Sequence, residues 1–222
     1  MAVVHDAHET RTLTGAARGQ RLPRRERRAQ LLDAAREVFV AQGYHAAAMD
    51  DIAEAAGVSK PVLYQHFPGK YELYLALVDQ NAAEIVAGVR ATMSSTHSYR
   101  EQVRAGMTAF FEFIDRESES FRLIFESDLT NDPAVQERIN AVNLDCARAI
   151  ADGFRQAVAM DEQDAEMLGI AVVGMAHVTA RHWLREGRQV PLDHAVELLA
   201  DLAWAGIRGL PVATRASSDT QS

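Results

Sequence analysis

The residues best suited to contact another molecule lie in a short stretch that begins at Ser59. Within eight positions it supplies a cation, an amide, two rings that can form hydrogen bonds and an apolar contact, and its candidates are Ser59, Lys60, Pro61, Val62, Tyr64, Gln65 and His66. Such groups read base edges in the major groove of duplex DNA, through hydrogen bonds and apolar contact with the thymine methyl. That groove is about 12 Å wide and admits a helix. The stretch therefore indicates a recognition helix for double-stranded DNA.

Further cations flank this stretch. Lys70 follows it at the start of the next predicted helix, where its ammonium and nearby backbone amides could hold a phosphate. Six arginines come before the first predicted helix and could follow the DNA backbone or enter a minor groove: Arg18, Arg21, Arg24, Arg25, Arg27 and Arg28. Residues 18–70 hold nine Lys and Arg against six Asp and Glu, whereas the whole chain has a formal charge of −8. We therefore expect the first third to bind a polyanion and the acidic remainder to have another role.

Three helical segments are expected to position these side chains. Residues 24–42 and 49–56 carry apolar residues at helical spacing and stop at Gly43 and Gly57, because glycine readily adopts the left-handed conformation that ends a helix. Ser59 is expected to cap the third helix with its hydroxyl. Short helices joined by a tight turn, as in MDDIAEAAGVSKPVLYQHF, form a helix-turn-helix motif.

The rest of the chain is also patterned as helices, so the predicted fold is all-α. Residues 1–22 and 211–222 lack apolar periodicity and are expected to be flexible tails. The single cysteine, Cys146, excludes an internal disulfide and fits a reducing cytosol. No export signal and no apolar stretch long enough to span a membrane occurs, so we expect a cytoplasmic protein without a membrane partner.

Residues 25–77 resemble the DNA-binding domain of the TetR family of bacterial transcription regulators. The resemblance is carried by LLDAAREVFVAQGY, IAEAAGVSKPVLYQHF and PGKYEL. It implies that the third helix contacts DNA and that Lys70 binds phosphate, with His66 where the family often has a phosphate-contacting Tyr. Ala47 and Ala48 stand where a Thr is common before the second helix, so no phosphate contact is carried over to them.

A narrower resemblance is to the actinobacterial TetR-like regulators of fatty-acid synthase operons. It is carried by RLPRRERRAQLLDAAREVFVAQGYHAA, SKPVLYQHFPGK, the RLIFESD run and a final WAGI segment. It implies a hydrophobic tunnel that takes long-chain acyl-CoA as effector and thereby weakens DNA binding. The alternative is a TetR-type repressor of an efflux or catabolic operon that responds to another hydrophobic small molecule.

The acidic part of the chain carries a Met and Phe stripe from about residue 99. Taken alone, such a stripe suits a packed core as well as a ligand cavity, and both alternatives stay open. Because the family binds small effectors, the candidate ligand-binding residues are Val103, Met107, Phe110, Phe111, Ile114, Phe121, Phe125, Phe154 and Met175.

Residues 164–185 are apolar on nearly all sides and need burial on two sides, and residues 191–209 add further apolar residues. By the resemblance they form a homodimer interface, with candidates Leu168, Val172, Trp183, Leu199, Leu202 and Trp204; burial within a monomer is the alternative. A dimer would place two recognition helices in successive major grooves of a pseudo-palindromic operator. The expected domains are residues 23–70 for DNA binding and 71–210 for effector binding and dimerisation.

The sequence does not indicate an enzyme. It has no nucleophile elbow, no glycine loop for phosphate and no carboxylate pair distinct from surface charge. His177 and His182 lack partners at metal-ligand spacing, so neither a metal nor a cofactor is expected. A sensor that binds protein through the same motif is a further rival, and its binding would be less sensitive to salt.

Overall fold

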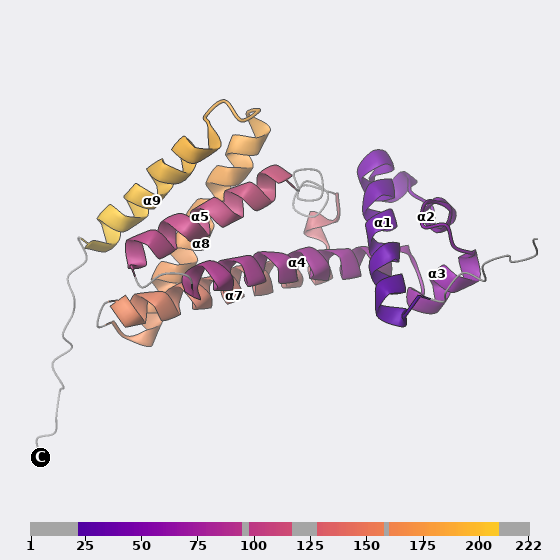
Figure 1. Cartoon of the computed structure of the whole chain (residues 1–222), viewed down its shortest axis with the longest axis horizontal. Coiled ribbons are helices and arrows are strands. Elements are labelled where there is room, and N and C mark those ends of the chain that lie inside the picture. Colours follow the sequence, from indigo (N-terminus) through magenta and orange to yellow (C-terminus); the bar gives the residue numbers. More distant parts are fainter. Residues whose placement is uncertain (1–21, 95–97, 117–127, 158–159, 209–222) are drawn as a thin grey trace, which may run out of the picture.

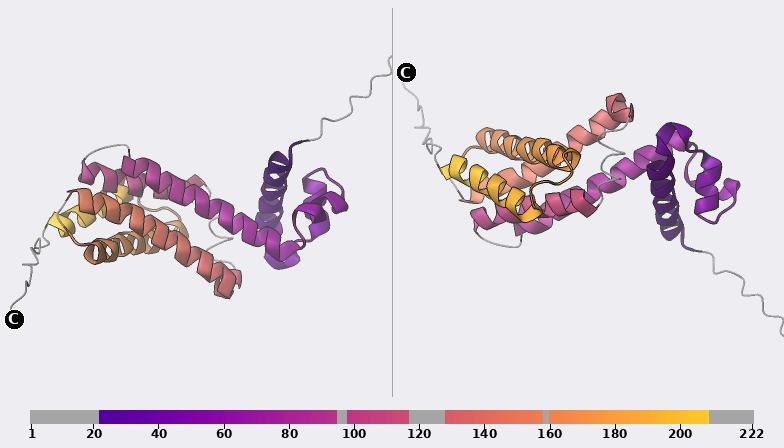
Figure 2. Two further views of the ribbon diagram at one scale, coloured as in Figure 1. Left: turned by 90° about the horizontal axis from the view of Figure 1, so that it is seen from below. Right: turned by 90° about the horizontal axis from the view of Figure 1, so that it is seen from above.

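A computed structural model describes residues 22–94, 98–116, 128–157 and 160–208. These residues form eight α-helices and one 3-10 helix and contain no strand, which confirms the all-α prediction for this part of the chain. The molecule is elongated (Figure 1), and three helices gathered at one end, here called the head, are separated from a larger helical body in both further views (Figure 2).

The head consists of α1 (Arg24–Ala46), α2 (Met49–Ala55) and α3 (Lys60–His66). Gly43 and Gly57 have φ of +78° and +63°, and a Cβ built at either would meet nothing within 4 Å. Glycine is therefore required at both positions by backbone conformation rather than by space. Gly43 interrupts the helix at the predicted stop, and helical geometry then resumes as far as Ala46, the end of α1.

The start of α3 corrects one expectation. Ser59 occupies the cap position, but its hydroxyl makes no capping hydrogen bond. Pro61, at the second helical position, has no N–H to offer it. The backbone amides of Val62 and Leu63 instead donate to the Ser59 carbonyl, at 2.9 and 3.3 Å.

The body is built on α4 (Lys70–Ser94), the long helix that runs from the head along the body (Figure 1). It packs on α5 (Tyr99–Arg116) and α7 (Pro133–Ala157), α7 packs on α8 (Glu162–Arg185), and α5 packs on α9 (Leu192–Arg208). The 3-10 helix η1 (Asp128–Asn131) lies just before α7. A Cβ at Gly169 of α8 would collide with the carbonyl oxygen of Ala147, so α7 and α8 approach each other closely there.

One apolar cluster runs from the head into the body, from Leu31 through Tyr74 and Ile85 to Phe111. A second, smaller cluster lies at the far end of the body and contains Val103, Ala151, Phe154, Ala165, Ala200 and Ala203. Both regions therefore share a continuous core.

Within the described ranges, no helix is long and apolar enough to cross a membrane. No group of three His, Cys, Asp or Glu side chains in this part of the chain could hold a metal ion.

Candidate DNA-binding surface and ligand cavity

The outward face of α3 is exposed among the described residues. Leu63 and Phe67 turn into the core, with 0% and 2% of their surface exposed, whereas Tyr64 is 49% exposed. The other candidates are exposed or half-buried: Ser59, Lys60, Pro61, Val62, Gln65 and His66. The Lys60 ammonium lies 2.5 Å from the Asp50 carboxylate on α2, so contact with DNA would have to compete with this exposed ion pair.

Cations from the start of α1 extend this surface. The Arg28 guanidinium stacks 4.3 Å from the centre of the Phe67 ring at the end of α3. Burial lowers the pKa of His66, and the nearby charges of Arg24, Arg28 and Arg27 lower it further. The α1 arginines thus lie beside the C-terminal end of α3. Arg24 and Arg25 are both exposed.

Lys70 makes contacts within the chain that the sequence did not predict. Its ammonium donates to the carbonyl oxygens of Tyr44, His45 and Ala47, at 2.8, 3.1 and 2.9 Å. An ammonium has three N–H groups, and all three are used to close the end of α1. Lys70 therefore joins α4 to the head, and its contact with a DNA phosphate stays a prediction.

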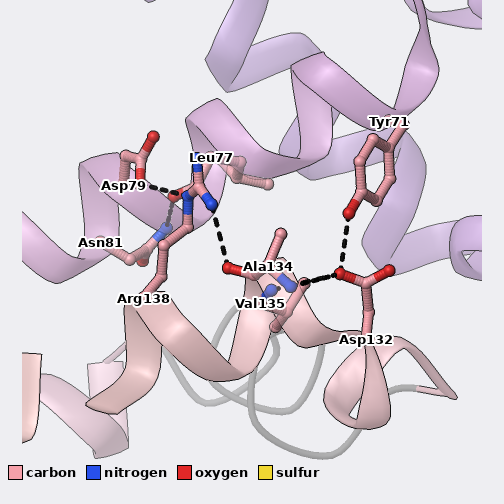
Figure 3. Close-up of polar contacts among 8 residues, drawn as sticks. All are labelled: Tyr71, Leu77, Asp79, Asn81, Asp132, Ala134, Val135 and Arg138. Atoms are coloured by element: carbon pink, nitrogen blue, oxygen red, sulfur yellow. Dashed lines mark hydrogen bonds and ion pairs between the residues drawn. The ribbon is translucent and has the colours of Figure 1, made fainter. Parts of the chain in front are cut away.

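The first turns of α4 are also bound to α7 (Figure 3). The Tyr71 hydroxyl donates to the Asp132 carboxylate at 2.7 Å. The same carboxylate accepts from the backbone amides of Ala134 and Val135, at 2.9 and 3.2 Å. The hydrogen bond from Tyr71 is the main cause that lowers the pKa of Asp132.

Two turns further along α4, a second polar contact follows. Arg138 donates to the Asp79 carboxylate at 2.7 Å and to the Ala134 carbonyl at 2.9 Å (Figure 3). The head-proximal part of α4 is thereby fixed on the N-terminal end of α7.

A cavity of about 60 Å³ lies between α4, α5, α7 and α8, and its wall is mostly apolar. Its lining comprises Ile85, Val89, Met93, Gln102, Val103, Gly106, Met107, Phe110, Val142, Asn143, Cys146, Ile150, Val172, Val173, Ala176 and His177. Burial raises the pKa of the Cys146 thiol to about 11, so this group is neutral at physiological pH and acts as an apolar part of the wall. The arrangement suits a hydrophobic ligand.

The predicted ligand residues divide into three groups. Val103, Met107 and Phe110 line the cavity. Phe111, Ile114 and Phe154 are fully buried in the two core clusters, Met175 packs against both of them, and none of these four lines the cavity. Phe121 and Phe125 lie outside the described residues. The walls from α4 and α7 were not predicted, although Ile85 and Val89 on α4, and Val142, Cys146 and Ile150 on α7, recur at helical spacing.

Large apolar side chains are exposed along α8 and α9. Met167, Ile170 and Val178 on α8 are 68%, 47% and 69% exposed, and Leu198 and Leu202 on α9 are 56% and 62% exposed. Such a surface on a soluble protein is typical of an interaction site.

Only part of the predicted interface set belongs to this surface. Trp183 is buried within the subunit, where its indole donates to the Val190 carbonyl at 2.6 Å and its ring meets Phe111. Val172 lines the cavity, and Leu168, Leu199 and Trp204 are half-buried against the cores of their own chain. Of the six predicted residues, Leu202 is the one that is strongly exposed.

A helix-turn-helix with an exposed outward face, carried by a helical body that contains an apolar cavity, is the arrangement expected of a regulator that combines DNA binding and ligand binding in one chain. Residues 31–77 match the family model of the bacterial regulatory proteins of the tetR family, and residues 99–206 match the tetracyclin repressor-like C-terminal domain. The chain belongs to the TetR family of transcription regulators.

Individual relatives agree with this assignment. The HTH-type transcriptional activator FasR of Mycolicibacterium smegmatis is 44% identical over 204 residues, which cover 92% of this chain and 93% of that protein. The crystal structure of a TetR-like transcriptional regulator from Rhodococcus sp. RHA1 has a TM-score of 0.66 at 30% identity and covers 86% of this chain and 100% of that one. FadR of Bacillus subtilis, in complex with stearoyl-CoA, shares the fold with a TM-score of 0.67 at 16% identity, over 80% of this chain and 98% of its own. The chain is therefore a transcription regulator rather than an enzyme.

Proposed function

We propose that the protein is a homodimeric, cytoplasmic regulator of fatty-acid synthesis genes that leaves its operator when long-chain acyl-CoA enters the body. One observation carries this proposal: α4, the helix that joins the head to the body, forms one wall of an apolar cavity. A ligand in this cavity acts directly on the element that positions α3.

The wall chemistry and the relatives support an acyl ligand. The cavity offers mainly aliphatic and Met side chains, which suit a hydrocarbon chain, while Gln102, Asn143 and His177 supply polar groups. The FasR resemblance points to fatty-acid genes, and a protein of the same fold has been seen with stearoyl-CoA. Because each water needs about 10–15 Å³ on the same measure, a cavity of about 60 Å³ holds only a few waters. A long acyl chain therefore has to move the walls apart.

The exposed surface of α8 and α9 supports the dimer. In the proposed homodimer this surface is covered by the same surface of a second copy, which would hold two heads at a fixed separation. Each α3 then enters a major groove, with half-sites about 34 Å apart on a pseudo-palindromic operator. Sedimentation of wild type and of Leu202→Glu tests this part: we expect a dimer and a monomer, respectively, with Leu22→Glu on the head as a control that stays dimeric.

The ligand is tested by a fluorescence anisotropy titration of DNA from the promoter region beside the gene. We expect stearoyl-CoA, but not coenzyme A alone, to weaken DNA binding. Val89→Phe fills the cavity from α4 and should abolish the response while DNA binding without ligand is retained. Val86→Phe makes the same change one turn earlier, at a residue that does not line the cavity, and should respond normally. A wild-type protein indifferent to stearoyl-CoA would rule out this effector.

A further inference from the structure

Two consecutive residues at the start of α4 form hydrogen bonds with different parts of the molecule, one with the head and one with the body. The Lys70 ammonium bonds to three carbonyl oxygens at the end of α1, in the head. The Tyr71 hydroxyl bonds to Asp132 just before α7, in the body, although these two residues are 61 positions apart in the chain. One turn of helix is therefore tied to both parts of the molecule.

Both ties are supported by further contacts. Asp132 is itself held by the backbone amides of Ala134 and Val135, so it cannot follow Tyr71 without disturbing the first turn of α7. On the other side, Lys70 lies 4.7 Å from the centre of the Tyr44 ring, in addition to its three hydrogen bonds. Tyr44 in turn packs edge-on against Tyr74 of α4, with ring centres 5.2 Å apart. The head is thus fixed to the first turns of α4 and moves with them.

The cavity lies far along the same helix. Its α4 wall is formed by Ile85, Val89 and Met93, which face Cys146 and Ile150 among the α7 residues. At 1.5 Å per residue, Ile85 and Met93 are about 21 and 33 Å from Tyr71 along the helix. A chain that forces this wall outward acts on α4 at a long distance from Tyr71.

We infer that Tyr71 and Asp132 are positioning residues that form the pivot of α4, about which a displacement at the cavity is turned into rotation of the head. A helix held near its head end, here at Tyr71 and also at Asp79, turns when its far end is pushed, whereas a helix released at Tyr71 is freer to slide sideways and keep its direction. Rotation changes the separation of two recognition helices, and sliding changes it far less. The ligand part of this inference rests on the proposed function, but the pivot also has a consequence without ligand.

That consequence is a fixed angle between head and body. Spin labels at Ala41→Cys on α1 and Gln163→Cys on α8, both exposed positions, measure it by electron paramagnetic resonance when labelled chains are diluted into unlabelled ones. Cys146 is buried and stays unlabelled. We expect one narrow distance distribution in this background, and a distribution at least twice as broad after Tyr71→Phe, which removes a single hydroxyl.

Two further variants control this measurement. Asp132→Ser keeps a side chain able to cap α7 but too short to reach Tyr71, so it should broaden the distribution as Tyr71→Phe does. Arg100→Gln breaks the 3.0 Å contact between Arg100 on α5 and Asp201 on α9, which does not involve α4, and should leave the distribution narrow. A narrow distribution in both pivot variants would overturn the inference.

The second readout is the ratio of DNA dissociation constants with and without saturating stearoyl-CoA. Coupling between sites is about 5–150-fold in such systems. In Tyr71→Phe we expect this ratio to fall at least threefold while the affinity for stearoyl-CoA stays within twofold, a pattern that mere loss of stability would not give. An unchanged ratio in a variant with a broadened distribution would also refute the pivot. If the wild type does not respond to stearoyl-CoA, the proposed effector fails, and the spin-label distances still decide the pivot.

Discussion

The head and the body each bury an apolar core, but the features left for function differ between them. In the head, Leu63 and Phe67 are buried, while Tyr64 between them is 49% exposed on the outward face of α3. In the body the candidate functional features are the apolar cavity and the large apolar side chains of α8 and α9 that are exposed among the described residues. The proposed function of the head therefore depends on which side chains α3 exposes. The proposed function of the body depends on how its helices pack, because packing determines the cavity and the exposed apolar surface.

The largest expected effect is on the free energy of unfolding, and it tests whether the head and the body also differ in how they contribute to stability. Leu31 in the head and Phe111 in the body are fully buried in one apolar cluster. We expect Leu31→Ala to lower the free energy of unfolding by about 2–5 kcal/mol and Phe111→Ala by about 3–5 kcal/mol. Because the cluster is continuous, denaturant unfolding followed by circular dichroism should show one transition in both variants.

Two separate transitions would contradict a shared core and make the head an independent unit. The matched surface change Ala41→Ser on α1 is exposed and should leave the midpoint almost unchanged.

The second prediction concerns the outward face of α3. Lys60→Ala and Tyr64→Ala should each weaken operator binding, by about 1–3 kcal/mol if the side chain makes a base contact. Neither side chain belongs to the core, so the melting temperature and the affinity for stearoyl-CoA should stay the same. Unchanged operator affinity in both variants would remove α3 as the recognition helix. A shallower dependence on salt in Lys60→Ala would indicate that this residue contacts phosphate.

Much of the head could be predicted from local rules. Gly43 and Gly57 mark turns because few other residues adopt their positive φ, and Leu63 and Phe67 identify the inner face by spacing alone. The role of Lys70 could not be predicted, because its three acceptors are 23 to 26 residues away and their position depends on how α1 meets α4.

The body was less predictable for the same physical reason. A helix that is apolar on most sides does not reveal which stripe faces the core, so Val172 and Trp183 were predicted at an interface although one lines the cavity and the other is buried. A cavity results from the packing of four helices, so the sequence pattern of any one helix gives little indication of it. The contact between Tyr71 and Asp132 likewise joins residues that no local pattern connects.

A third prediction contrasts two glycines. Gly57 has φ +63°, so Gly57→Ala should destabilise the head by about 1–2 kcal/mol, the cost of a left-handed conformation for an L-residue. Gly88 lies inside α4 with nothing within 4 Å of a built Cβ, so Gly88→Ala should stabilise the protein by about 0.5–1 kcal/mol. Thermal unfolding measures both. A loss of stability in Gly88→Ala would show that α4 needs local flexibility there.

The smallest expected effect is on the pH dependence of operator affinity, which should come from the head and not from the body. Burial, followed by the charges of Arg24, Arg28 and Arg27, lowers the pKa of His66, which favours the neutral ring in the protein without DNA. Bound phosphates would raise the pKa of His66, and DNA binding would then take up a proton. Operator affinity should therefore rise as pH falls from 7.5 towards 6, at constant salt.

His177, in the cavity wall, should not contribute to this effect. Its pKa is lowered by burial and then by Arg181, and an apolar ligand would favour the neutral ring still more. A pH series of anisotropy titrations on wild type, His66→Gln and His177→Gln discriminates between the two. We expect His66→Gln to flatten the dependence and His177→Gln to preserve it. The reverse pattern would mean that protonation of His177 in the body, rather than of His66 in the head, makes operator affinity depend on pH.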